Sequence, residues 1–128
     1  MQGPGVVSAA LVAVVLVVLA SITATAAVAA ADGAGRRNRT AGIRITSVMR
    51  SPATWTAGHL AARPSILSGC KISGTLAVLS VALTPYGVLY FAALAASVLA
   101  LLGGVGYGTY AARKAALAVA RDPRQPAD

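Results

Sequence analysis

Charged side chains are scarce in this sequence of 128 residues, and acidic ones are nearly absent. Only 11% of the residues are charged, whereas a soluble domain carries about 25%. The acidic residues are Asp32, Asp122 and Asp128, and the chain has one His and one Cys. This inventory cannot supply paired carboxylates, a Ser/His/Asp set or a cluster of metal ligands. The sequence therefore predicts no enzyme activity, no cofactor and no metal site.

Large aromatic side chains are also few, with one Trp, one Phe and four Tyr, so a packed soluble core is not expected. Apolar residues nonetheless make up 57% of the chain, and no charged residue occurs in residues 6–31 or 72–112. Uncharged apolar runs of this length indicate membrane spans; the alternative is a buried helix of a larger assembly. A Lys, Arg or Asp at the centre of a span costs about 2.5–3.5 kcal/mol, and neither run contains one.

The second uncharged run has the boundary residues of a span. Within this run, Pro85 precedes the stretch from Tyr86 to Tyr110, where a helix begins without needing that N–H, and Arg113 and Lys114 follow the run. Residues 88–108 extend about 30 Å at 1.5 Å per residue, which matches the hydrocarbon thickness. We therefore predict a transmembrane helix over residues 85–111 and a short basic cytoplasmic tail over residues 112–128. Aromatic residues lie at both ends of this helix, as at membrane interfaces: Tyr86, Tyr90, Phe91, Tyr107 and Tyr110.

The first uncharged run changes from Val and Leu to small, weakly polar residues over residues 21–31. This gradient is typical of a secretory signal peptide, with cleavage after Ala26 or Ala31. Residues 1–5, however, contain no Lys or Arg, and the run is long enough to span the membrane uncleaved. The sequence leaves two alternatives for residues 1–31, a signal peptide or a first membrane helix.

Residues 32–84 are expected to form a short luminal or extracellular segment. Seven of the eleven basic residues lie between the uncharged runs, but aromatic residues do not alternate with them, so nucleic-acid binding is not expected. Frequent Gly and Pro residues predict irregular structure, with one short strand at Ile43, Ile45 and Val48 and His59 as a polar loop residue. Residues 72–84 are interpreted as a pre-membrane segment, with a bent or re-entrant span as the alternative.

Two residues of this segment are candidate modification sites. Asn38 begins the triplet Asn-Arg-Thr, which is an N-glycosylation sequon. Cys70 is the only cysteine, about 15 residues before the predicted span. In an oxidising lumen an odd cysteine favours an intermolecular disulfide, and the alternative is a free thiol. A disulfide at Cys70 would hold a partner close to the membrane surface.

Small residues repeat every four positions along the predicted span, and Gly104-x-x-x-Gly108 is the centre of the series. This spacing lets two helix backbones approach closely in lipid. Because 13 of the 21 residues from 92 to 112 are Gly, Ala, Ser or Thr, composition alone could also produce the series. The predicted packing face consists of Ala92, Ala96, Ala100, Gly104, Gly108 and Ala112.

This arrangement resembles that of herpesvirus envelope glycoprotein N. Residues 82–90 (Ala-Leu-Thr-Pro-Tyr-Gly-Val-Leu-Tyr) resemble the Pro-aromatic entry to that family's span, and residues 55–58 (Trp-Thr-Ala-Gly) resemble the Trp-containing luminal motif of some members. Those members have a cysteine four residues after the Trp, where this chain has His59, so only Cys70 could take the cysteine's role. The resemblance implies a glycosylated type I protein of virion envelope and host Golgi membranes. It also implies a disulfide-linked or tightly packed heterodimer with the multispan glycoprotein M, acting in that partner's maturation, virion assembly and entry.

Two other interpretations remain. Residues 104–108 and 120–123 are similar to the first helix and loop of the ATP synthase proteolipid ring subunit, but that family needs a second helix with a membrane-embedded carboxylate, which this sequence lacks. Alternatively, both uncharged runs span the membrane. The positive-inside rule then places the basic loop in the cytoplasm and both chain ends outside, which would leave Asn38 unglycosylated and Cys70 reduced. That protein would have two spans and a structural or subunit role.

We therefore predict an α-helical membrane protein with a single C-terminal transmembrane helix after an N-terminal signal peptide, and a largely irregular ectodomain. Its function would be interaction, with the 92–112 face packed on a partner helix and Cys70 locking the pair covalently. The expected partners are membrane lipid and a glycoprotein M-like multispan protein. No nucleic acid and no small-molecule substrate are expected.

Overall fold

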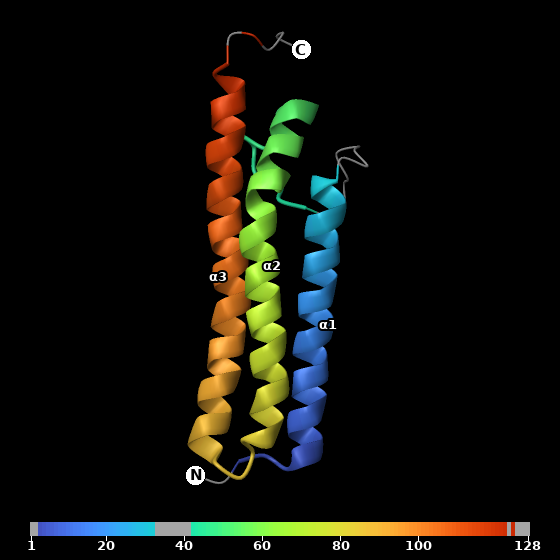
Figure 1. The fold of residues 1–128 in the computed structure, drawn as a ribbon, viewed down its shortest axis with the longest axis vertical. Coiled ribbons are helices and arrows are strands. Elements are labelled where there is room, and N and C mark those ends of the chain that lie inside the picture. Colours follow the sequence, from blue (N-terminus) through green and yellow to red (C-terminus); the bar gives the residue numbers. More distant parts are fainter. Residues whose placement is uncertain (1–2, 33–41, 123, 125–128) are drawn as a thin grey trace.

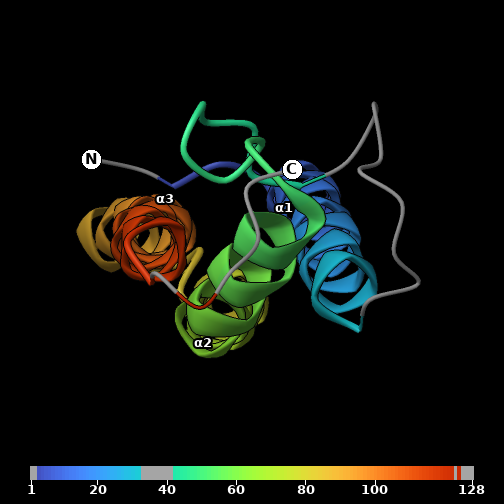
Figure 2. The same ribbon diagram turned by 90° about the horizontal axis from the view of Figure 1, so that it is seen from above.

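A computed structural model of the chain describes residues 3–32, 42–122 and 124, and these residues form three long helices (Figure 1). The helices are α1 (Val6–Ala31), α2 (Pro52–Ala82) and α3 (Gly87–Ala120). They run alternately up and down the bundle, and α2 packs against both α1 and α3 (Figures 1 and 2). The lower end of the bundle in Figure 1 holds the start of α1 and the α2–α3 turn, and the upper end holds the end of α1, the start of α2 and the end of α3.

All three helices are long and apolar enough to cross a membrane. The predicted fold class, with a single C-terminal span and a largely irregular ectodomain, is therefore wrong. The segment expected to be luminal contains α2. Residues 72–82, expected to lie in a separate pre-membrane segment, form the end of α2, and residues 83–84 begin the α2–α3 turn. The remaining prediction, that the protein belongs in a membrane, agrees with these helices.

Local sequence explains why α2 begins at residue 52 despite its loop-like composition. The Ser51 hydroxyl accepts a hydrogen bond from the Thr54 backbone N–H at 3.2 Å, and the Ser51 N–H donates to the Thr54 hydroxyl at 2.9 Å. This reciprocal capping box, with Pro52 in the first turn, satisfies donors that a helix start leaves unpaired. Pro64 lies inside α2 on its exposed side, and the helix continues through it.

Helices α2 and α3 are held together by small residues and by hydroxyl groups. A Cβ placed on Gly69 would lie 2.8 Å from the Cα of Gly104, so the two backbones are in direct contact there. One turn closer to the lower end, the buried Ser97 hydroxyl donates to the Ser73 carbonyl oxygen at 2.8 Å, and the two hydroxyl oxygens are 3.1 Å apart. Close backbone approach and hydrogen bonds between helices are the contacts that drive helix association in lipid.

Helix α1 contributes a different surface. Its buried residues are all alanines, spaced by four or seven positions: Ala9, Ala13, Ala20, Ala27 and Ala31. Ala20 and Ala27 belong to the same apolar cluster as Ala62, Ile66 and Cys70 of α2. Cleavage of a signal peptide after Ala26 or Ala31 would remove this face from the bundle.

Both ends of α1 are tied by more specific contacts. At the upper end, Arg63 of α2 donates to the Asp32 carboxylate at 2.9 Å. At the lower end, Gly3 packs directly against the Thr84 carbonyl in the α2–α3 turn, where a Cβ would clash. Because both side chains of the Arg63–Asp32 pair are substantially exposed, we assign it no more than about 1 kcal/mol.

Candidate functional site

Charge is distributed very unevenly over the bundle. Residues 3–5 and 83–86, at the lower end, contain no charged side chain. The charged residues of the described chain lie at or near the upper end, with the single exception of Lys71 in α2: Asp32, Arg44, Arg50, Arg63, Arg113, Lys114, Arg121, Asp122 and Arg124. The described chain thus has two charged features, a basic upper end and an isolated lysine.

At the upper end, residues 42–50 fold onto the first turns of α2. The Ile43 N–H donates to His59 Nε2 at 2.9 Å, and His59 Nδ1 lies 2.9 Å from the Trp55 carbonyl oxygen. Nε2 accepts, so Nδ1 carries the proton and donates to Trp55, which defines the neutral tautomer. Gly42 adopts a positive φ of 110°, and a Cβ there would lie 2.7 Å from His59 Nε2. The loop thus depends on a glycine at this position.

These contacts correct two expectations. His59 is not a loop residue but a helical residue that is 98% buried, since its exposed fraction is 2%. The Ile43–Ile45 stretch forms no strand in the described structure; instead the Ile45 carbonyl accepts from the N–H groups of Val48 and Met49 in a tight turn. The alternation of apolar residues reflects side chains packed on α2, where Val48 covers Gly58.

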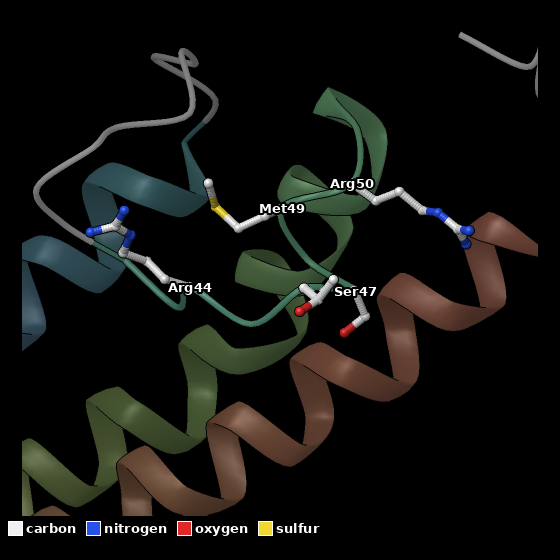
Figure 3. A pocket seen from close by; sticks show the side chains of 5 residues that line it. Arg44, Ser47, Met49 and Arg50 are labelled. Atoms are coloured by element: carbon white, nitrogen blue, oxygen red, sulfur yellow. The ribbon is translucent and has the colours of Figure 1, made fainter.

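The same loop borders an open hollow of about 640 Å³, lined by Arg44, Thr46, Ser47, Met49 and Arg50 (Figure 3). Figure 3 shows that Arg44 extends toward the α1 side, whereas Arg50 extends in the opposite direction toward the end of α3. The two guanidinium groups therefore do not converge on one ligand. Their separate positions suit a basic rim that faces the headgroups of a membrane surface.

Lys71 lies at the middle of the bundle, on its outside. Its position along the bundle axis follows from its neighbours in α2, because Gly69 contacts Gly104 of α3 and Ser73 bonds to Ser97 of α3. Lys71 is therefore level with about residue 100 of α3, which is about 10 Å along the axis from Tyr107 and about 15 Å from Tyr90. Its side chain is exposed, and no ion pair to it occurs within residues 3–32, 42–122 and 124.

A charge at this depth is costly, since lysine at the centre of a membrane helix is unfavourable by about 2.5–3.5 kcal/mol. The lysine stem reaches roughly 6 Å, from five bonds of about 1.5 Å each, so the ammonium group stays several ångströms below the upper aromatic belt. A lysine that faces lipid at this depth needs either a counter-charge or a polar surface beside it.

The face of α2 around Lys71 is polar in other ways as well. Ser68, one turn away, is exposed, and its hydroxyl makes no hydrogen bond to any described residue. Thr75 is also exposed and donates to the Lys71 carbonyl oxygen at 2.9 Å. Beside them, no heavy atom lies within 4 Å of the position a Cβ would take on Gly74. We call Ser68, Lys71, Gly74 and Thr75 the polar α2 face.

The structure places the sequence-predicted site residues as follows. Cys70 is a free thiol buried in the bundle core with 6% of its surface exposed, so an intermolecular disulfide would require it to leave that core. Asn38 lies outside the described residues. Of the predicted packing face, Gly104, Gly108 and Ala112 contact α2 of the same chain, and so does the Ala100 carbonyl, whereas Ala92 and Ala96 are exposed.

The sequence reasoning missed Lys71 because this lysine marked the edge of the second uncharged run. The signal that could have identified it is the capping box at residues 51–54, which marks the start of the helix that contains Lys71. Among the described residues no group of three or more His, Cys, Asp or Glu side chains could hold a metal ion.

Comparisons with known proteins give no relative: no family model, no curated protein and no solved structure matches the chain. Function must therefore be inferred from the bundle itself.

Proposed function

We propose that this protein is a non-catalytic subunit of a membrane protein complex, held in the bilayer by α1, α2 and α3. The observation that carries the proposal is Lys71, an exposed charge in the middle of a helix long and apolar enough to cross a membrane, with no ion pair in the described chain. Ionisable residues inside the membrane face a bundle interior, a water-filled cavity or a partner. Lys71 faces outward from its own bundle, so we infer that a partner protein supplies its counter-charge.

The orientation of the subunit follows from the charge distribution. The segment between α1 and α2 carries five arginines and one aspartate, and the segment after residue 112 is also net basic. With three spans both segments lie on the same side, whereas the two-span alternative separates them. The positive-inside rule then favours a cytoplasmic upper end, with the N-terminus and the α2–α3 turn on the other side.

This orientation bears on the other predictions from sequence. A cytoplasmic α1–α2 segment would keep Asn38 away from the glycosylation machinery and Cys70 away from an oxidising lumen. A glycoprotein M-like partner, a virion envelope and the Golgi stay predictions that rest on the resemblance alone. The subunit role needs none of them.

The test is the composition of the particle that the full chain forms in its native cells. After cross-linking in intact membranes and extraction in mild detergent, we expect a particle of defined size that contains this chain and at least one other membrane protein in constant ratio. Mass spectrometry of the particle measures that ratio. A particle containing only copies of this chain, or a monomer, would refute the subunit role.

A further inference from the structure

We infer that the polar α2 face is the docking site for a transmembrane helix of a different protein, and that this helix carries an Asp or Glu at mid-membrane depth. The inference rests on the proposed subunit function and specifies the chemistry of the partner. Its starting point is the combination of an exposed ammonium group and an exposed, unpaired hydroxyl one turn apart, Lys71 and Ser68.

The geometry of this face fits a helix better than it fits lipid. Gly74 and Ser68 leave the α2 backbone only lightly covered, with no heavy atom within 4 Å of a Cβ built on Gly74. Small residues on a membrane helix let a second backbone approach closely. A carboxylate on that second helix would pair with the Lys71 ammonium, and its backbone or side chains would meet the Ser68 hydroxyl. Lipid tails offer neither a charge nor a hydrogen-bond acceptor.

Lipid headgroups are excluded as the counter-charge by depth. Lys71 lies between the contacts Gly69–Gly104 and Ser73–Ser97, whereas headgroups lie beyond the aromatic belts. The other basic residues of the described chain belong to segments at or near the upper end of the bundle, which the proposed orientation places toward the headgroups. Lys71 therefore requires a different kind of anion, namely a carboxylate that a second membrane helix holds at the same depth.

A second copy of this chain does not supply that anion. Its acidic residues within the described structure are Asp32, at the end of α1 and paired with Arg63, and Asp122, beyond the end of α3. Neither lies at the depth of Lys71, and a symmetric dimer through this face would bring two lysines together. Charge complementarity thus requires a partner of different sequence.

The experiment uses the purified full chain in phosphatidylcholine vesicles, with synthetic transmembrane peptides of Leu and Ala that carry one central residue. Four fluorescently labelled peptides have Asp, Asn, Lys or Leu at the centre, and energy transfer from the labelled chain reports binding. We expect the Asp peptide to bind about tenfold more tightly than the Leu peptide, because close opposite charges couple strongly when desolvated. Equal affinities for these two peptides would overturn the inference.

Variants separate charge pairing from other causes. Lys71→Leu should abolish the preference for the Asp peptide, and Lys71→Asp should transfer the preference to the Lys peptide. Lys114→Leu, at the upper end, is the matched control and should leave the preference unchanged. Circular dichroism verifies that each variant keeps its helices. An Asn peptide that binds as tightly as the Asp peptide would show a hydrogen bond instead of an ion pair, and would also overturn the inference.

The native particle distinguishes this inference from the proposed function. If the particle contains a partner and Lys71→Leu releases it, both stand. If the partner stays bound in the same ratio, the subunit role stands and the docking site is wrong. If wild-type particles contain no partner, the subunit role itself fails.

Discussion

Replacing Gly104 by alanine tests the close contact between α2 and α3. The new Cβ would lie 2.8 Å from the Cα of Gly69 and 2.8 Å from the Ser65 carbonyl oxygen, while ordinary contacts are 3.4–4 Å. Both neighbours are backbone atoms and cannot rotate away, so the helices must separate by roughly 1 Å. A gap of that size forfeits about a quarter to a half of each dispersion contact it opens, and overpacking of this kind costs about 1–3 kcal/mol.

Gly103→Ala provides the matched control. Gly103 lies next to Gly104 in the same helix, but no heavy atom lies within 4 Å of its Cβ position. There the substitution should stabilise the helix by about 0.5–1 kcal/mol, because alanine loses less conformational entropy than glycine on folding. The two variants should thus shift stability in opposite directions. On α2, Gly69→Ala and Gly74→Ala form a second pair with the same expected signs.

The assay is reversible unfolding in mixed micelles with increasing dodecyl sulfate. Trp55, the single tryptophan, is only 2% exposed in the folded chain and reports unfolding by fluorescence. Circular dichroism measures the helices independently. If Gly104→Ala and Gly103→Ala shift the midpoint equally, the α2–α3 contact is not the one described here.

Three further outcomes follow from the fold. Expressed in mammalian cells, the chain should show no endoglycosidase-sensitive glycan at Asn38, because the proposed orientation places the basic segment in the cytoplasm; a mobility shift would reverse that orientation. His59→Phe should leave the Ile43 N–H without its acceptor and cost about 1–3 kcal/mol. Hydrogen exchange should then accelerate over residues 43–49, and unchanged exchange would show that His59 does not hold this loop. Cys70 should react with a maleimide only after dodecyl sulfate opens the bundle, so rapid labelling of the folded chain would contradict its burial.

The first uncharged run and the predicted span overlap two of the three helices. The uncharged run at residues 6–31 coincides with α1, and the predicted span at 85–111 lies largely within α3, which continues to Ala120. Both apolar segments could be recognised in the sequence because the composition changes sharply where each uncharged run ends. Composition could not decide between a cleaved and a retained first segment. The alanines of α1 fit either alternative, and only the structure shows that they pack against α2.

The second helix was missed because its sequence mixes the signals of loop and membrane. Arg63, Pro64 and Lys71 interrupt the apolar pattern, and its buried side includes polar residues such as His59 and Ser73. Those polar groups are satisfied by partners far away in the chain, which no local pattern reveals. The small-residue series of α3 was recognised as a packing face. In the structure, the part of this series nearest the upper end packs against α2 of the same molecule.

The buried face of α1 consists only of methyl groups, and this affects how the molecule can be built and how it can change. Such a surface has no large side chain that must fit one particular hole, so by itself it allows sliding and rotation of α1 on α2 at little cost. Register is therefore set at the two ends, where Asp32 meets Arg63 and Gly3 meets the Thr84 carbonyl.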